Sequence, residues 1–118
     1  MFGIQWDLVM KYVETKGGKT QDELKDSTTW GNYSNATFDI TRGEYSATEG
    51  LWNEVNAKYT KPTESVILTT GTTNRNSALN IFDLSGNVWE WTLEYTSGSN
   101  GSCVSIGGAY DNNGKEYS

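Results

Sequence analysis

The chain has 118 residues and a formal net charge of −6 at pH 7, with 15 acidic against 9 basic side chains. This length corresponds to one domain, expected over residues 1–118. Lys and Arg form no cluster longer than two residues. Because binding to nucleic-acid phosphates needs clustered cations, the composition argues against direct nucleic acid binding.

The residue types that the sequence lacks limit the catalytic sites, metal sites and disulfides that it can form. The sequence has no His and a single Cys, which excludes imidazole-dependent catalytic triads, zinc-protease motifs and an internal disulfide framework. It has no apolar run of roughly 18–20 residues and no signal-peptide pattern, so we expect a cytoplasmic chain that binds no membrane. Gly, Ser, Thr and Asn supply 50 of the 118 residues, which predicts many turns and loops.

Two helices are predicted at the start of the chain. Apolar residues recur at helical spacing over residues 4–13, and a Gly pair at 17–18 ends the segment as a C-cap would. Thr20 and Glu23 have the spacing of a capping box, which predicts a short second helix through Lys25. The apolar stripe predicted for the first helix carries Ile4, Leu8, Val9, Tyr12 and Val13, and it is widened by Trp6 and Met10.

The middle of the chain carries few periodic signals. We predict that residues 27–61 are irregular and held in place by isolated aromatic side chains. Residues 65–70 (SVILTT) form a β-rich run between Pro62 and Gly71 and predict a short strand. Residues 72–80 are predicted to be a polar loop.

Two antiparallel strands are predicted near the C-terminus. Residues 88–95 alternate between apolar and polar side chains, which predicts a strand whose buried face carries Trp89, Trp91 and Leu93. Residues 103–110 read as the returning strand. Cys103 would be a small buried side chain in it.

The turn between the middle region and these strands could bind a metal ion. Asp83, Gly86, Val88 and Glu90 fall at spacing i, i+3, i+5 and i+7. Two carboxylates then bracket a tight turn whose carbonyls can point inward, and calcium prefers this mixture of ligands. In the alternative interpretation, Asp83 caps the turn, Glu90 is solvated and the neighbouring Trp residues belong to the core.

The same segment resembles a known family. Residues 83–95 (DLSGNVWEWTLEY) followed by residues 104–110 (VSIGGAY) are similar to the C-terminal part of the formylglycine-generating enzyme (sulfatase-modifying factor) family. Residues 30–32 (WGN) look like that family's upstream WGN triplet. The resemblance implies an α+β fold of the loop-rich, C-type-lectin-like type, with an N-terminal helix and few short antiparallel strands.

The resemblance implies calcium but neither copper nor catalysis. One family calcium site corresponds to the Asp83 side chain, the Gly86 and Val88 carbonyls and the Glu90 side chain. A second follows the WGN triplet, where Asn35 and Ala36 are the nearest match. The family enzymes bind copper through two cysteines just after the GG motif, where this sequence has none. We therefore expect no copper, no catalytic residues and no enzymatic activity.

The resemblance also implies an incomplete domain and a protein partner. The family's early strands and its last C-terminal strand have no counterpart in this sequence, so we expect a homodimer or a partner protein to complete the sheet. Family relatives without the cysteines include ligand-display domains of phages and bacteria. We therefore expect a non-catalytic binding module, of phage or mobile-element origin. The candidate ligand-binding residues are Tyr110, Asp111, Asn112, Asn113 and Tyr117.

A second function stays open at this point. The acidic balance of the chain also suits an inhibitor or decoy that blocks a nuclease or another nucleic-acid-binding partner by mimicking phosphates.

Overall fold

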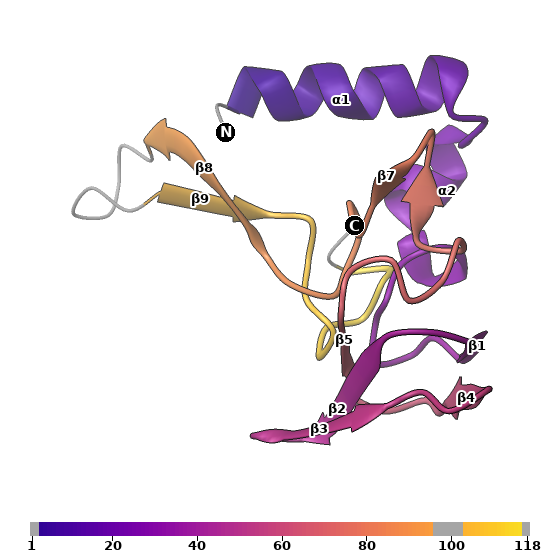
Figure 1. Cartoon of the computed structure of the whole chain (residues 1–118). Coiled ribbons are helices and arrows are strands. Elements are labelled where there is room, and N and C mark those ends of the chain that lie inside the picture. Colours follow the sequence, from indigo (N-terminus) through magenta and orange to yellow (C-terminus); the bar gives the residue numbers. More distant parts are fainter. Residues whose placement is uncertain (1–2, 96–102, 117–118) are drawn as a thin grey trace.

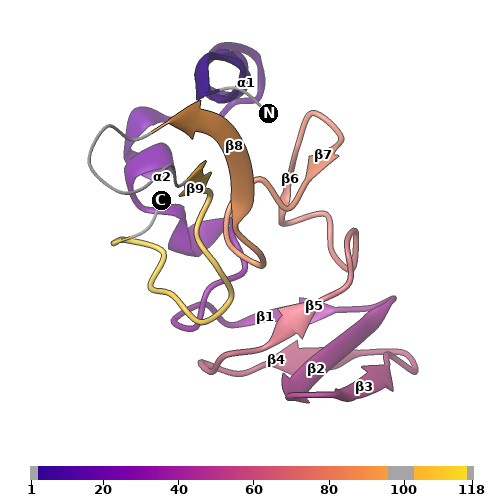
Figure 2. The same ribbon diagram turned by 90° about the vertical axis from the view of Figure 1, so that its left-hand side faces the viewer.

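The fold is mixed α+β, with one long helix and several short antiparallel strands. The computed structural model describes residues 3–95 and 103–116. In Figure 1, helix α1 (Gly3–Lys16) lies along the top and strands β1 to β5 lie at the bottom. The hairpin of β8 and β9 projects to one side between them. The molecule therefore has an upper half, made of the helices and strands β6 to β9, and a lower half, made of β1 to β5 (Figures 1 and 2).

The predicted helices are confirmed, but only part of the predicted apolar stripe of α1 is buried. Val13 is fully buried and Trp6 and Val9 pack against the core, whereas Ile4, Leu8 and Tyr12 are exposed. Both sets have helical spacing, and only contact with the rest of the chain selects one of them. In helix α2 (Gln21–Lys25) the capping box forms as predicted, because the Thr20 side chain accepts from the Glu23 amide and the Glu23 side chain accepts from the Thr20 amide. A 3₁₀ turn (Ser27–Thr29) follows.

The prediction that residues 27–61 are irregular is wrong. Strand β1 (Phe38–Ile40) pairs with β4 (Tyr59–Lys61), and β2 (Glu44–Thr48) lies between β3 (Leu51–Glu54) and β5 (Ile67–Leu68). All these pairs are antiparallel. These strands have two to five residues, and β3 is exposed along its whole length. Runs this short offer too few alternating positions to reveal a strand in the sequence.

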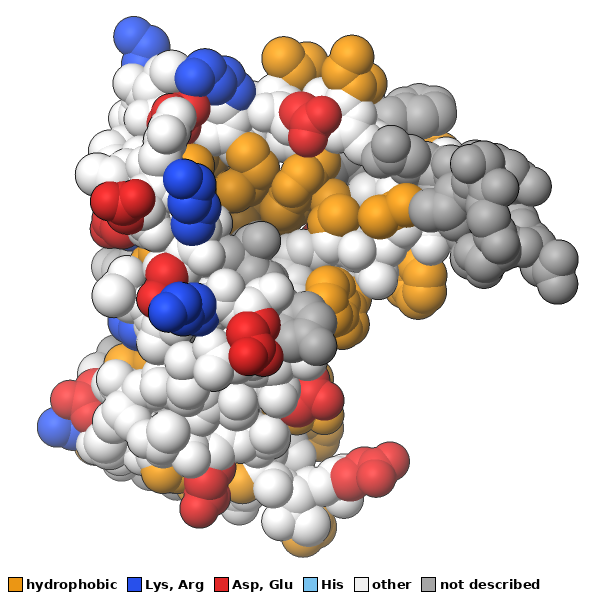
Figure 3. Space-filling model, turned by 180° about the vertical axis from the view of Figure 1, so that it is seen from behind, with side chains coloured by type: hydrophobic (Ala, Val, Ile, Leu, Met, Phe, Trp, Pro, Cys, Tyr) orange, Lys and Arg blue, Asp and Glu red, His pale blue; other side chains and the backbone are white. Residues whose placement is uncertain are grey.

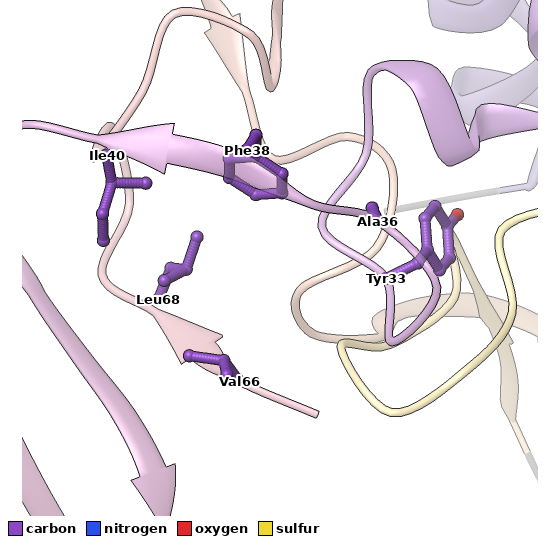
Figure 4. Packing of buried hydrophobic residues seen from close by; sticks show 6 residues of the cluster. All are labelled: Tyr33, Ala36, Phe38, Ile40, Val66 and Leu68. Carbon is purple, nitrogen blue, oxygen red and sulfur yellow. The ribbon is translucent and has the colours of Figure 1, made fainter. Parts of the chain in front are cut away.

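The core of the lower half is small and gathers side chains from distant parts of the sequence. Figure 4 shows Phe38 and Ile40 of β1 facing Val66 and Leu68, with Tyr33 and Ala36 at one end. The rings of Tyr45 and Tyr59 stack with centroids 3.7 Å apart and pack against this cluster. These aromatic contacts agree with the predicted role of aromatic side chains in holding this region together.

The upper half has a separate core and two hairpins. Val13, Trp30, Ala78 and Leu84 are buried together. Strands β6 (Ser77–Ala78) and β7 (Ile81–Phe82) form a minimal hairpin, of which β6 lies in the segment predicted to be a polar loop and β7 directly after it. Strand β8 (Glu90–Tyr95) pairs with β9 (Cys103–Ile106), which confirms the predicted antiparallel pair.

The predicted buried face of β8 is wrong. Trp91 and Leu93 are 69% and 63% exposed, Trp89 is half-buried, and Thr92, on the opposite face, is buried. The Thr92 hydroxyl donates to the Val104 carbonyl across the hairpin at 3.0 Å. Alternation along a strand defines two faces, but the rest of the chain decides which face it covers.

Cys103 is also exposed, in contrast to the prediction that it is buried. Within the described residues, no helix is both long and apolar enough to cross a membrane.

Candidate functional site

The turn that carries the calcium motif is the junction of the two halves. Residues 84–87 are all buried. Asn32 forms a parallel bridge with Gly86, in which the Asn32 amide donates to the Ser85 carbonyl and the Asn87 amide donates to the Asn32 carbonyl. Gly86 has a φ of +72°, and a Cβ there would collide with the Asn32 backbone. Only glycine fits this close approach of two backbones.

Two buried amide side chains lock this junction. Asn87 Oδ1 accepts from the Leu68 amide and Asn87 Nδ2 donates to the Leu68 carbonyl, both at 3.0 Å. Asn87 therefore pairs with β5 as a neighbouring strand would. Asn32 Nδ2 donates to Asn87 Oδ1 and to the Val66 carbonyl. Sequence reasoning missed this pairing, although a Gly-Asn pair occurs both at 31–32 and at 86–87.

The structure places Asp83 and Glu90 at the two ends of this turn, both partly buried. Asp83 has a φ of +57°, and its amide donates to the Asn76 carbonyl at 2.8 Å. The Glu90 carboxylate lies against Gly107, where a side chain would overlap it. Glu90 is therefore half-buried rather than freely solvated, in contrast to the alternative interpretation of the motif.

The surroundings of these two carboxylates disfavour their ionised forms. Asp83 Oδ2 and Glu90 Oε2 are buried and have no hydrogen-bond partner among the described residues. Burial raises the pKa of Asp83. Burial, together with the charge of Asp83, raises the pKa of Glu90 to about 8. A cation bound at either unpartnered oxygen would favour the ionised form of that carboxylate.

The residues present therefore fit a calcium ion. Calcium takes oxygen ligands of mixed type, and the two carboxylates flank the Gly86 and Val88 carbonyls in the sequence. The Gly86 carbonyl also accepts from the Val88 amide at 2.9 Å, which closes the turn tightly. The described part of the chain has no cluster of three or more His, Cys, Asp or Glu side chains, so backbone carbonyls would have to complete the shell.

The candidate ligand-binding segment divides into an inward and an outward part. The Asn112 carbonyl accepts from the Ser34 amide and hydroxyl, and Asn112 Oδ1 accepts from the Ala109 amide. Asn113 Oδ1 accepts from Asn35 Nδ2 at 3.2 Å. These two amides hold the segment onto the loop after Asn32, whereas Asp111 is exposed. Tyr117 lies outside the described residues.

Tyr110 lines a cleft in the described part of the chain. The cleft has a volume of about 400 Å³ and lies between the β2–β3 hairpin and the C-terminal segment. Figure 3 shows the molecule hollowed on the side between its upper and lower halves. Trp52 of β3, which is 49% exposed, is the second aromatic residue of the cleft. Its other lining residues are Ser46, Ala47, Glu49, Gly50, Ser65 and Ile67.

Sequence reasoning found Tyr110 but missed Trp52, which belongs to the segment predicted to be irregular. The two residues matched to the second implied calcium site also accept hydrogen bonds within the chain. Asn35 Oδ1 accepts from the Gly114 amide, and the Ala36 carbonyl accepts from the Lys61 ammonium at 2.9 Å.

Comparisons of the chain with protein-family models, with curated proteins and with solved structures found no match.

Proposed function

We propose that this chain is a non-catalytic binding module on a scaffold like that of the formylglycine-generating enzyme family, and that the cleft beside Tyr110 holds the ligand. The proposal rests on one observation, namely that Trp52 and Tyr110 both line this cleft. These residues are 58 positions apart in the sequence, so the fold is needed to bring them together.

The lining favours a polypeptide ligand. Trp and Tyr supply large contact areas at low cost in side-chain entropy, and both are enriched where proteins bind other proteins. Ser46 and Ser65 add hydroxyl groups, and Glu49 adds an exposed negative charge. The expected ligand is therefore a short segment of a protein partner that carries an apolar side chain and a basic one.

Calcium has a structural part in this proposal. Asp83 and Glu90 would hold the ion through their side chains and Gly86 and Val88 through their carbonyls. The ion would neutralise two buried carboxylates in the turn that joins the halves. Because the loop before Tyr110 is tied to this turn by the bond from the Tyr110 amide to the Asn87 carbonyl, calcium would also steady one wall of the cleft.

A random-peptide display library selected on the intact protein tests the function. Peptides selected with calcium present are synthesised, and their affinities are measured for the wild type and for Trp52→Ala and Tyr110→Ala. We expect each substitution to weaken binding at least about tenfold, the effect of truncating an aromatic anchor at the centre of an interface.

Trp91→Ala is the matched control, since Trp91 is an exposed aromatic residue outside the cleft. It should leave the affinities unchanged. Peptides that bind all three variants as well as the wild type would contradict the cleft as the ligand site. Failure of the library to yield any specific peptide would contradict the polypeptide ligand.

No specific observation favours the acidic decoy over the binding module. On the face shown in Figure 3, acidic side chains lie scattered among Lys and Arg rather than in one continuous strip. A phosphate mimic needs clustered negative charge to fit a basic groove.

A further inference from the structure

Lys61, the last residue of β4, points its ammonium group into the interior of the lower half. Its side chain is fully buried. Nζ lies 2.9 Å from the carbonyl oxygens of Tyr33, Ala36 and Glu64 and 3.1 Å from that of Pro62. Four backbone carbonyls from two loops therefore converge on one positive charge.

The number of acceptors exceeds what a lysine needs. An ammonium group has three N–H donors, so at least one of the four contacts shares a hydrogen with another. A shell of carbonyl oxygens around a single positive charge is how proteins replace the hydration shell of a bound potassium ion. The arrangement thus resembles a cation site more than a set of side-chain hydrogen bonds.

Neutral oxygens surround this charge. None of the ion pairs among the described residues involves Lys61. Glu64 contributes its carbonyl and a favourable longer-range charge, whereas the charge of Arg75 opposes that of Lys61. The face of the Phe38 ring lies 5.8 Å from Nζ and 4.3 Å from the Arg75 guanidinium carbon. Burial lowers the pKa of Lys61 to about 8, which still leaves the group protonated near neutral pH.

We propose that the carbonyls of Tyr33, Ala36, Pro62 and Glu64 form a site for one monovalent cation, and that the chain fills this site with its own Lys61 ammonium. The charge follows from the ligands, because four neutral oxygens can solvate a single positive charge, whereas calcium takes six to eight oxygens and usually several carboxylates. The proposal does not depend on the ligand cleft.

The ammonium has a structural task in this arrangement. It joins the turn in which the Ala36 amide donates to the Tyr33 carbonyl to the turn in which the Glu64 amide donates to the Pro62 carbonyl. These turns flank Asn32 and Val66, whose contact helps to hold the two halves together. The lower half would thus carry its own cation and need no metal.

Chemical rescue of a truncated side chain tests the proposal. In Lys61→Ala the carbonyls lose their cation and a channel opens to them, so the melting temperature should fall by roughly 10 °C or more. Potassium chloride or n-propylammonium chloride should restore part of this loss, increasingly with concentration, as binding to the folded state requires. Tetramethylammonium chloride, which is too large and donates no hydrogen bond, should not.

Lys61→Met separates charge from volume, because it fills the channel without a cation. It should melt below the wild type and respond equally to all three salts. The proposal is overturned if Lys61→Met is as stable as the wild type, if tetramethylammonium rescues Lys61→Ala equally well, or if calcium rescues it better than potassium does.

The wild type provides a second measurement should neither variant fold. In the ¹⁵N-labelled protein near neutral pH, Lys61 should give an ammonium signal with slowly exchanging protons. The side chain of Lys58, which is 60% exposed, should give none. A neutral amine at Lys61, or proton exchange as fast as at Lys58, would overturn the proposal.

Discussion

Both halves of this molecule bury charge, but they provide hydrogen-bond partners for it to different extents. Around Lys61, four carbonyl oxygens surround one ammonium group. Around Asp83 and Glu90 in the upper half, two carboxylate oxygens are buried without a hydrogen bond among the described residues. The fold thus completes one charged site from within the chain and leaves buried oxygens of the other without a partner among the described residues.

This difference shows how a small core can tolerate buried charge. A buried ion costs several kcal/mol unless hydrogen bonds or an opposite charge replace the water that it loses. The lower half meets this requirement with backbone groups of two loops. The upper half meets it only when the carboxylates are protonated or bound to a cation, so its stability should depend on pH and calcium. The junction formed by Asn32 and Asn87 couples the two halves.

A large effect on stability is expected from breaking that junction. Asn87→Ala leaves the amide and carbonyl of Leu68 without their partners and removes a bond to Asn32. We expect the free energy of unfolding to fall by about 3–5 kcal/mol, since each buried polar group left unpaired costs about 1–3 kcal/mol. Urea denaturation measures the loss. Asn53→Ala, at an exposed position of β3, is the control and should change little.

Calcium should stabilise the upper half. At a concentration about a hundred times its dissociation constant, the ion should add about 2.7 kcal/mol to the free energy of unfolding. The melting temperature should therefore rise with calcium, and EDTA should reverse the rise. Magnesium should substitute poorly because it requires a tighter octahedral shell.

Asp83→Asn should remove most of this calcium effect, whereas Glu44→Gln, at an exposed acid of β2, should preserve it. A wild-type melting curve that millimolar calcium does not move would contradict the calcium site, and the two halves would then differ only in how well their buried charge is satisfied.

In calcium-free protein, stability should fall as the pH rises. Between pH 4.5 and about 8, folded Glu90 keeps a proton that the unfolded chain has released, so the folded state loses its advantage through this window. We expect a loss of about 2 kcal/mol, less than the full pKa shift implies because solvent still reaches part of the half-buried carboxylate. Denaturation in EDTA over this range measures it. Glu90→Gln should flatten the profile, and an unchanged slope in that variant would assign the dependence to another group.

The smallest effect is expected at Trp91. Because its side chain is 69% exposed, Trp91→Ala should change the free energy of unfolding by less than about 1 kcal/mol. Trp30→Ala is the contrasting variant: that side chain is 2% exposed, and its Nε1 donates to the Glu23 carbonyl at 2.8 Å. It should cost about 3–5 kcal/mol. Equal losses in the two variants would show that the β8 face is covered after all.

Sedimentation of the wild type over a range of concentrations tests the homodimer predicted from the resemblance. A partner that completes the sheet should appear as a concentration-dependent shift toward a dimer. A strict monomer at the highest concentration would contradict this prediction.

Local patterns in the sequence predicted the features that depend on neighbouring residues. Helical spacing predicted α1, and the spacing of Thr20 and Glu23 predicted the capping box. Alternation predicted the β8–β9 pair, and the spacing of Asp83 and Glu90 predicted two carboxylates around one tight turn. In each case the residues that interact lie within a few positions of one another or on one regular element, so their order in the chain is enough to place them.

Tertiary structure decided everything that depends on which surfaces meet. Two faces of α1 and two faces of β8 were both compatible with the sequence, and contact with the core selected Val13 and Thr92 for burial. The meeting of Trp52 with Tyr110 and the carbonyl shell around Lys61 each join segments more than 20 residues apart. Backbone carbonyls have no signature in a sequence, because every residue carries one. Only the folded chain can show four of them around one charge.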